Sequence, residues 1–245
     1  MSRLHDLAIQ RYAEHYKRAY TTTDPRSLSR HKLGKMERTY AGLLRELPEG
    51  SRILDLGCGT GFMLFWLRQH PGIVPVGVDS CDGQIEIARK ALPDIEVHCE
   101  GGLEFLRKNP EAFAGIFCTD VLEHLPEMDL CLEWAEAAWS ALRPGGFFLC
   151  RTPNAANLTA AFGLYGNVTH YRAFTDLSLS ETLEAAGFED CRAVPDRPSR
   201  LLGHVQQGLE RLVHRAVFLL CNRTYKGVFT TNVSVVGFKA KAASD

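Results

Sequence analysis

The sequence lacks any strong excess of charge. Its 245 residues include 28 Lys and Arg and 29 Asp and Glu, which gives a formal net charge of −1 and a pI of about 6.8. Without a long-range basic field the chain would attract a phosphate backbone poorly, so we expect no nucleic-acid partner. The 45% hydrophobic composition is that of a globular protein rather than of a disordered chain.

Cysteine pairs with metal-binding spacing are also missing. We expect neither a zinc site nor thioredoxin-type chemistry, because no CxxC pair occurs among the eight cysteines, at positions 58, 81, 99, 118, 131, 150, 191 and 221. Several of them lie in apolar runs that are typical of buried strands, and buried free thiols favour a reducing compartment. The charged start, MSRLHDLAIQRYAEHYKRAY, has no signal-peptide pattern, and no run reaches the roughly 20 apolar residues of a membrane span. These absences predict a cytoplasmic protein without a transmembrane segment.

What the sequence does contain is an alternation of strands and helices. Apolar strands are predicted at 52–56, 74–78, 95–99, 114–119 and 146–151, with helices near 61–70, 82–92, 102–108 and 128–142. Later elements are a helix that starts at Thr175 or Asp176 and stops at Gly187, a strand at 188–194, a helix at 199–222 and a strand at 229–239. The alternation indicates right-handed crossovers and a parallel sheet. We predict a Rossmann-like α/β fold: a seven-stranded, mostly parallel sheet with helices on both faces, an antiparallel last strand and a small helical cap.

A glycine-rich turn, ILDLGCGTGFML at 53–64, follows the first of these strands. Gly57, Gly59 and Gly61 lead from the strand into a helix, and glycines there permit positive φ and let a ligand lie against bare backbone. The dinucleotide pattern would need a glycine at position 62, where Phe62 stands, so NAD is not expected. The second strand ends in VGVDS, where Asp79 can accept hydrogen bonds from both hydroxyls of a ribose.

The combination of strand, DxGxGxG turn, helix, strand and Asp resembles the class I S-adenosylmethionine-dependent methyltransferases, and the likeness extends over most of residues 50–195. It implies S-adenosylmethionine as the cofactor, with its methionine part near Asp55 and the glycine turn and its ribose on Asp79. The family usually has an acidic residue after the third strand for the adenine, but Gly101 and Gly102 stand there. Adenine contacts are therefore expected from the backbone of Gly102 and Leu103, or from a displaced Glu100. The full set of expected cofactor contacts is Asp55, Gly57, Cys58, Gly59, Gly61, Asp79, Ser80, Gly102, Leu103, Thr119, Asp120 and His124.

The segment CTDVLEHLPEMD follows the fourth strand, so Asp120, Glu123 and His124 should face the cleft beyond the carboxyl ends of the strands. The resemblance places this segment beside the methionine moiety and the methyl group. Methyl transfer from a sulfonium needs no metal, so our first expectation is a site without one. Two alternatives stay open: the two carboxylates cap the next segment while the histidine packs, or all three hold magnesium, as in ubiquinone-pathway O-methyltransferases with a similar segment.

A second likeness concerns the region after the fifth strand. TPNAAN, THYRAFT, the AAGF helix end and TTNVSVVGFK are similar to a subgroup of bacterial methyltransferases encoded with surface-polysaccharide biosynthesis. That likeness implies a sugar hydroxyl, often on a lipid-linked glycan, as the methyl acceptor. His170 would then be the catalytic general base, with Tyr171 and Arg172 shaping the acceptor pocket, although a purely structural histidine is the alternative.

The sequence thus predicts an O-methyltransferase that acts on a sugar or glycan hydroxyl. Two alternatives remain: a quinone or phenolic O-methyltransferase with magnesium at Asp120, Glu123 and His124, and a non-catalytic cofactor-binding regulator. One domain is expected over 1–245, divided into a helical cover at 1–47, with helices at 4–20 and 31–47, a cofactor-binding core at 50–195, an inserted helix at 196–228 and the last strand at 229–240. The N-terminal helices and residues 153–175 and 196–228 should cover the cleft.

The predicted helix at 199–222 has an apolar stripe with Arg200, Arg211 and Arg215 near its edges. Packing of this stripe on the domain or on a partner subunit is the ordinary expectation. Peripheral docking on a membrane surface, which would suit a lipid-linked acceptor, is the alternative.

Overall fold

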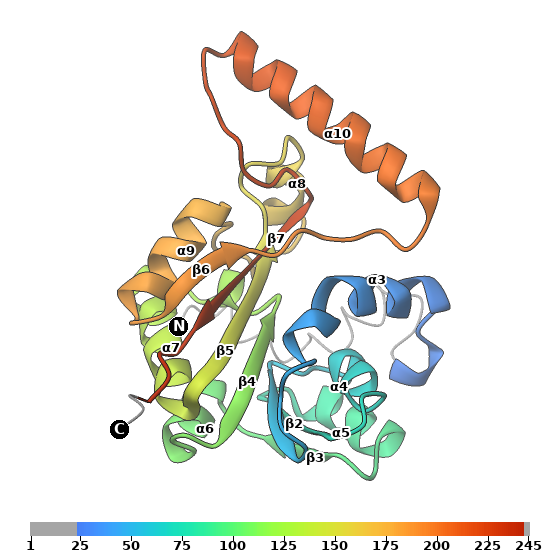
Figure 1. Cartoon of the computed structure of the whole chain (residues 1–245), viewed down its shortest axis with the longest axis vertical. Coiled ribbons are helices and arrows are strands. Elements are labelled where there is room, and N and C mark those ends of the chain that lie inside the picture. The colour runs from blue at the N-terminus through green and yellow to red at the C-terminus, as the bar shows by residue number, and fades with distance from the viewer. Residues whose placement is uncertain (1–23, 243–245) are drawn as a thin grey trace.

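A mixed β-sheet forms the centre of the computed structural model, which describes residues 24–242; the predicted helix at 4–20 lies outside these residues (Figure 1). Within the described part, the sheet has seven strands in the order β3-β2-β1-β4-β5-β7-β6. They are β1 (Ser51–Leu56), β2 (Ile73–Asp79), β3 (Glu96–Cys99), β4 (Phe113–Thr119), β5 (Leu142–Pro153), β6 (Glu189–Ala193) and β7 (Asn232–Phe238). Neighbours from β3 to β5 are parallel, and β7 runs antiparallel to both β5 and β6. The predicted fold class is confirmed.

The helices alternate with the strands as the sequence predicts. They are α3 (Arg30–Tyr40), α4 (Phe62–Leu67), α5 (Asp82–Ala91), α6 (Gly102–Lys108), α7 (Met128–Ala141), α8 (Ala160–Tyr165), α9 (Asp176–Ala185) and α10 (Leu201–Leu220), with short 3-10 turns η1 (Pro25–Ser27), η2 (Ala41–Leu43) and η3 (Leu122–His124). The predicted start of α9 is confirmed at Thr175, whose hydroxyl accepts from the Ser178 amide while the Ser178 hydroxyl accepts from the Thr175 amide. Gly187, at φ +97°, follows its end.

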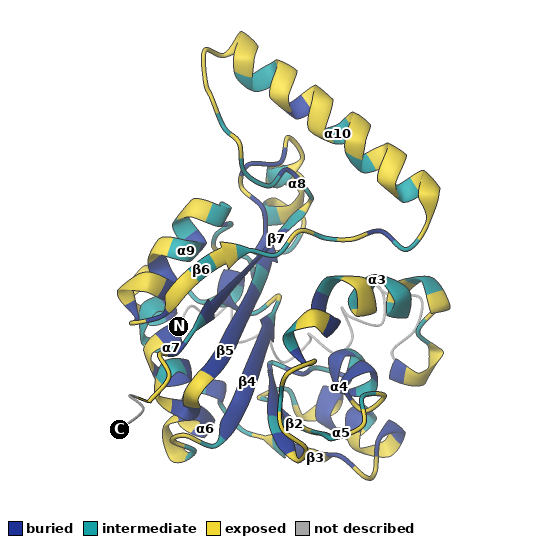
Figure 2. Ribbon diagram, in the orientation of Figure 1, coloured by how far each residue is buried: buried dark blue, intermediate teal, exposed yellow. Residues whose placement is uncertain are grey.

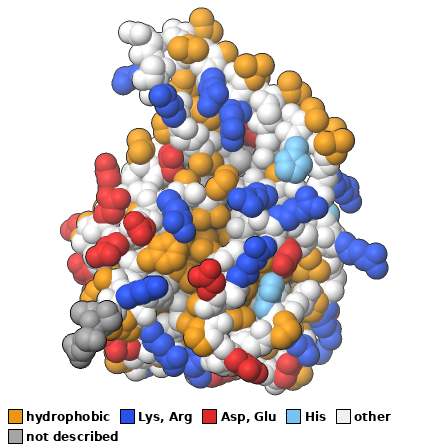
Figure 3. All heavy atoms as spheres, viewed as in Figure 1, with side chains coloured by type: hydrophobic (Ala, Val, Ile, Leu, Met, Phe, Trp, Pro, Cys, Tyr) orange, Lys and Arg blue, Asp and Glu red, His pale blue; other side chains and the backbone are white. Residues whose placement is uncertain are grey.

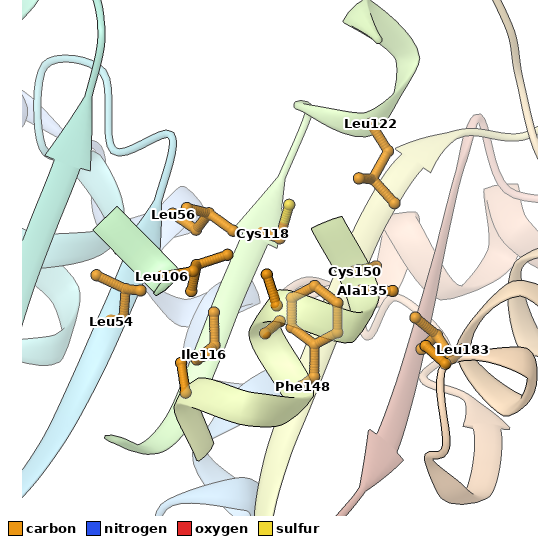
Figure 4. Close-up of a cluster of buried hydrophobic side chains, with 14 of the residues drawn as sticks. Leu54, Leu56, Leu106, Ile116, Cys118, Leu122, Ala135, Phe148, Cys150 and Leu183 are labelled. Carbon is orange, nitrogen blue, oxygen red and sulfur yellow. The ribbon is translucent and has the colours of Figure 1, made fainter. Parts of the chain in front are cut away.

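Side chains from alternate positions of the strands pack on opposite faces of the sheet, as the two-residue period of a strand requires. Ile53 and Phe117 face α3 and α4, in a cluster with Tyr40 and Trp66. On the other face, strand side chains meet those of α6, α7 and α9, as Figure 4 shows for Leu54, Leu56, Leu106, Ile116, Cys118, Phe148 and Leu183. Burial on both faces explains the continuous apolar runs of the central strands.

The strand order reverses direction between β1 and β4. From β1 the chain builds outward to β2 and β3, and then returns to start β4 on the other side of β1. The crossover connections therefore leave in opposite directions at this point and open a crevice at the carboxyl ends of the two strands. The glycine turn after β1 and the Asp120 segment after β4 lie at this crevice.

The long helix α10 stands apart from the sheet and its covering helices (Figure 1), and most of its surface is exposed (Figure 2). His214 is its one buried residue. The expectation that its apolar stripe packs on the domain is wrong for the described chain, since Leu209 is 60% and Leu212 66% exposed. The polar side of the helix faces the domain instead. Among residues 24–242, no helix is long and apolar enough to cross a membrane.

Candidate active site

A cavity of about 840 Å³ opens at the carboxyl ends of β1, β2 and β4, a volume that is ordinary for a cofactor with a small substrate. Eleven of the twelve expected cofactor contacts line it: Asp55, Gly57, Cys58, Gly59, Asp79, Ser80, Gly102, Leu103, Thr119, Asp120 and His124. The exception is Gly61. A Cβ there would lie 3.0 Å from Leu92 and 3.6 Å from Ala88, so this glycine serves the packing of α4 on α5.

The glycine turn has a backbone that other residues could not adopt without displacing their neighbours. Gly57 has a φ of +77°, and a Cβ on it would lie 2.4 Å from the side chain of Val121. Gly59 has a φ of +53°, and its Cβ would meet the amide oxygen of Gln84 at 2.5 Å. The Gly57 and Cys58 amides donate to the Val78 carbonyl at 2.8 and 3.0 Å, which ties the turn to β2. Bare backbone therefore borders the cavity, as the sequence predicts.

Asp55 is a fully buried carboxylate, and neither of its oxygens has a hydrogen-bond partner among the described residues. Burial, together with the nearby charge of Asp79, raises the pKa of Asp55 to about 8. Leaving a buried acceptor unsatisfied is costly, and the cost is relieved by any ligand that brings donors or positive charge. Because Asp55 lines the cavity, this carboxylate is suited to a cationic or N–H-bearing part of a cofactor.

Asp79, at the end of β2, has its carboxylate held by the turn. Its Oδ2 accepts from the Gly59 amide at 2.9 Å and its Oδ1 from the Cys81 amide at 2.8 Å. Burial raises the pKa of Asp79, and these backbone donors act in the opposite direction. Each oxygen keeps further acceptor capacity, so both can receive the hydroxyls of a ribose in the cavity. This geometry fits the role that the sequence assigns to Asp79.

The third-strand end of the cavity is tightly packed, and its lining is apolar except for Glu104, a carboxylate that was not predicted from the sequence. Gly102 opens α6, and a Cβ there would lie 2.7 Å from the Trp134 ring and 2.8 Å from Leu56. Leu103, Leu130 and Trp134 line this part of the cavity, which suits a flat aromatic group such as adenine. The alternative contact Glu100 does not line the cavity; its carboxylate pairs with Lys108 at 2.5 Å.

The carboxylates after β4 do not gather as the magnesium alternative requires. Asp120, at φ +59°, forms an ion pair with Arg151. Glu123 is buried with one oxygen lacking a described partner, and burial, with the charge of Asp120, raises its pKa well above the usual range. The ligand atoms that lie together, within 4.8 Å of one another, belong to Glu123, His124 and His170. Two imidazoles and a carboxylate form a donor set typical of transition metals rather than of magnesium.

A chain of hydrogen bonds connects His170 to His124. His170 Nδ1 lies 2.9 Å from the Gly163 carbonyl, which can only accept, so His170 Nε2 accepts from the Asn167 amide at 3.3 Å. The Asn167 oxygen then receives the Thr169 amide at 3.1 Å and hydroxyl at 2.9 Å.

This chain sets the tautomer of His124. With its proton directed to Asn167, the Thr169 hydroxyl can only accept from His124 Nδ1, at 2.9 Å, and the Thr169 carbonyl, 3.2 Å from the same nitrogen, is also an acceptor. The neutral ring of His124 therefore carries its proton on Nδ1, and its basic lone pair is on Nε2.

His124 lines the cavity, whereas His170 does not. The two rings lie 4.7 Å apart at an angle of 73°, with His170 behind His124. Tyr171 and Arg172 are also outside the cavity lining; the Tyr171 amide donates to the Glu123 carbonyl at 2.7 Å and the Arg172 guanidinium to the Pro126 carbonyl at 2.6 Å. These contacts fasten the segment after α8 onto the segment after β4.

The cleft is covered only partly by the elements expected to cover it. The described N-terminal helix α3 contributes Lys32, Lys35, Met36, Thr39 and Tyr40, as predicted. Of 153–175 and 196–228 only Thr169 and Asp196 reach the cavity, because α8 and α10 lie farther out. Arg151 and Gln84 were not predicted. The position of Arg151 near the carboxyl end of a strand is a signal that could have identified it.

Comparison with known proteins agrees with this geometry. A family model described as a methyltransferase domain matches residues 28–193, well over half of the chain. The chain belongs to this methyltransferase family. Its cofactor is S-adenosylmethionine, and the unsatisfied Asp55 carboxylate, the glycine backbone and Asp79 fit that cofactor's charged, flexible and ribose parts.

Individual relatives of this methyltransferase give further detail. It is 31% identical over 110 residues to a ubiquinone biosynthesis O-methyltransferase of Coxiella burnetii, covering 43% of this chain and 45% of that protein. It is 30% identical over 162 residues to one of Dinoroseobacter shibae, covering 58% and 61%. The chain thus spans about half the length of the curated relatives it matches.

Solved structures share the fold. A SAM-dependent methyltransferase from Archaeoglobus fulgidus superposes with a TM-score of 0.66 at 21% identity, covering 86% of this chain and 95% of that one. A phosphoethanolamine N-methyltransferase 2 of Haemonchus contortus, solved in complex with S-adenosyl-L-methionine, superposes with a TM-score of 0.58 at 15% identity, covering 94% and 60%.

Proposed function

We propose that this SAM-dependent methyltransferase transfers its methyl group to a hydroxyl oxygen, with His124 receiving the hydroxyl proton. The observation that carries the proposal is the state of His124, which lines the same cavity as Asp55 and Asp79 and has its Nδ1 proton held by Thr169. In this tautomer the basic atom of the ring is Nε2, the nitrogen that can receive a proton from an acceptor hydroxyl. The two ubiquinone biosynthesis O-methyltransferase relatives support oxygen as the methylated atom.

The cofactor supplies an electrophilic methyl carbon on a sulfonium, so the protein's main task is alignment. Asp79 and the glycine turn orient the cofactor by holding its ribose. The Asp55 carboxylate offers the cofactor a buried hydrogen-bond acceptor. His124 orients the acceptor hydroxyl through a hydrogen bond and holds the departing proton on Nε2. Alignment of this kind contributes most of the rate, and base catalysis adds about 10²–10⁴-fold.

The sequence assigns the catalytic base to His170, and we keep that residue in the proposal in a different role. Both of its ring nitrogens are engaged, one by the Gly163 carbonyl and the other by the Asn167 amide. These bonds support a positioning role, in which His170 sets the orientation of the Asn167 amide and, through Thr169, the tautomer of His124.

A sugar or glycan hydroxyl is our first candidate for the acceptor, because the NVTHYRAFT segment that suggests it contributes Thr169 to the cavity beside His124. A phenolic or quinol hydroxyl is the second candidate, favoured by the names of the relatives. The weaker acidity of an alcohol makes a positioned base more necessary for a sugar than for a phenol.

Radiolabelled methyl transfer from S-adenosylmethionine to panels of glycans and of phenols tests both candidates. In His124→Ala, we expect turnover to fall by about 10²–10⁴-fold, with a much smaller change in cofactor affinity. Thr169→Val should lower turnover less, and the matched Thr169→Ser, which keeps the hydroxyl, should stay near the wild-type rate. His170→Ala should move the acid limb of the pH–rate profile as well as lower turnover.

Four outcomes would count against this assignment. Full activity in His124→Ala would exclude His124 as the base. A larger loss of turnover in His170→Ala than in His124→Ala would return the role of base to His170. Abolition of transfer by EDTA would favour a metal at Glu123, His124 and His170. Cofactor binding without transfer to any acceptor would favour the non-catalytic regulator.

A further inference from the structure

The long helix α10 is turned opposite to an ordinary surface helix. Its hydrogen bonds with the domain come from the inward side: Gln207 donates to the Asp196 carbonyl at 3.2 Å, and Glu210 accepts from Asn157 at 3.0 Å. On the same side, the Phe218 ring packs against the Phe229 ring, with centroids 5.4 Å apart. The buried His214 accepts from the Leu158 amide at 2.9 Å. A surface helix normally buries its apolar stripe. In α10, these hydrogen bonds and the contact with Phe229 hold the inward side, while the apolar stripe remains outside.

That outer stripe is continuous over the length of the helix. Eight apolar residues of α10 fall within one third of the helix circumference. They are 52–86% exposed: Leu201, Leu202, Val205, Leu209, Leu212, Val213, Leu219 and Leu220. Hydrophobic side chains run along the outer edge of α10 in Figure 3. An exposed apolar surface of this extent marks a binding site for a protein or a membrane.

Charge decides between these two partners. Residues 197–226 carry six basic side chains and one acidic one, whereas the whole chain has a formal net charge of −1. The acidic residue, Glu210, is turned inward onto Asn157. Arg211 and Arg215 fall on the helical arc adjacent to the apolar stripe, and Figure 3 shows basic side chains gathered beneath it.

We propose that α10 docks on an anionic lipid surface, with its leucines in the acyl boundary and Arg211 and Arg215 at the headgroups. An apolar face with a basic flank is the pattern of a helix that lies in the membrane interface. A second copy of this chain fits worse, because two α10 helices would bring like-charged flanks together without acidic partners.

Vesicle co-sedimentation of the full chain tests this proposal, which does not depend on the methyl acceptor. We expect binding to vesicles of phosphatidylcholine with 30% phosphatidylglycerol, little binding to pure phosphatidylcholine, and loss of binding in 1 M salt. Arg211→Glu/Arg215→Glu should lower the affinity at least tenfold, because each basic residue near an anionic leaflet contributes about fivefold. Leu209→Ser/Leu212→Ser should lower it similarly.

Matched controls separate docking from general charge and from misfolding. Arg45→Glu/Lys90→Glu makes the same charge change at exposed positions away from α10, and should bind vesicles as the wild type does. All variants should retain wild-type affinity for S-adenosylhomocysteine, which shows that they are folded. Failure of the wild type to bind anionic vesicles would overturn the proposal. So would a dimer, detected by sedimentation equilibrium, that Leu209→Ser/Leu212→Ser dissociates and that excludes vesicle binding.

Discussion

The cofactor end of the cleft and the helix α10 both leave groups without partners, but the groups are of opposite kinds. At the cleft, the unsatisfied groups are polar and buried, above all the Asp55 carboxylate. On α10 they are apolar and exposed, as Leu209 is. Burial keeps solvent from the Asp55 carboxyl, which is a group that water would hydrogen-bond. The Leu209 side chain is exposed to water, with which it forms no hydrogen bonds.

This difference shows what each region is prepared to receive. Asp55 lies in β1 and Asp79 at the end of β2, where backbone bonds from Gly59 and Cys81 fix the Asp79 carboxylate. Carboxylates placed on strands in this way select one small ligand by geometry. The α10 stripe has no comparable fixed donors and selects by area and charge. The cleft therefore recognises its ligand specifically, through directional hydrogen bonds. The helix α10 attracts its partner through a broad hydrophobic effect that has no preferred direction.

The largest effect is expected at the cleft. Asp79→Ala should weaken S-adenosylhomocysteine binding at least 100-fold, because two ribose hydroxyls lose a charged acceptor at about 1.5–3 kcal/mol for each bond. Isothermal titration measures this loss. The matched control is Asp94→Ala, which removes an exposed carboxylate that pairs with Arg68 on the surface and should leave the affinity unchanged. Equal affinities in the two variants would show that another carboxylate holds the ribose.

A smaller, pH-dependent effect should come from Asp55. Its pKa of about 8 means that the ligand-free protein holds this carboxyl protonated at neutral pH. If a cationic cofactor binds the ionised form, affinity should rise with pH by up to about tenfold per unit below pH 8 and level off above it. Asp55→Asn should remove this component of the slope, and titrations of both proteins from pH 6 to 9 compare the slopes directly.

For Asp55, the stability of the cofactor-free protein should depend on pH in the opposite direction to cofactor affinity. An acid whose pKa is raised on folding stabilises the folded state below its unfolded pKa, and that contribution is lost as the pH rises toward 8. Asp55→Asn should therefore raise the melting temperature of the cofactor-free protein at pH 9 while weakening cofactor binding. A lower melting temperature at pH 9 would mean that Asp55 has a partner when the cofactor is absent.

The smallest effects are expected from substitutions on α10, and their effect on stability should differ between the inward and the outward side of the helix. His214→Ala leaves the Leu158 amide without its acceptor and removes a buried ring that lies 5.1 Å from Phe229, so it should cost about 1–3 kcal/mol of unfolding free energy. Leu209→Ala changes an exposed side chain and should stay within about 0.5 kcal/mol. Urea unfolding of both variants measures the difference. A cost of several kcal/mol for Leu209→Ala would mean that the stripe is buried in the free protein.

The sequence predicts the sheet and the cofactor end well, because both depend on local pattern. The alternation of apolar strands and helices reports the fold, and the turn at Gly57 and Gly59 has a backbone that only glycine adopts easily. Gly61 does not line the cavity, and its place beside Leu92 and Ala88 shows that a glycine of such a motif can serve helix packing as well as a ligand.

Less could be predicted where contacts join distant segments. That Thr169 holds His124, 45 residues away, follows from how the segment after α8 folds back, which no local period reports. The orientation of α10 is similar: periodicity identifies an amphipathic helix, but which side meets the domain depends on Asn157 and Leu158, far away in the chain.

One feature of the fold connects the two regions that differ so strongly. Helix α3, which lines the cavity, is bonded to residues 196–199, which lead into α10: Lys35 pairs with Asp196 at 2.5 Å, and Thr39 accepts from the Arg197 amide at 3.1 Å. Arg38 adds a bond to the Pro198 carbonyl at 3.3 Å. Whatever restrains α10 thereby also restrains a wall of the cofactor cavity. By thermodynamic reciprocity, an anchor that tightens cofactor binding through these bonds must itself be tightened by the cofactor, to the same factor.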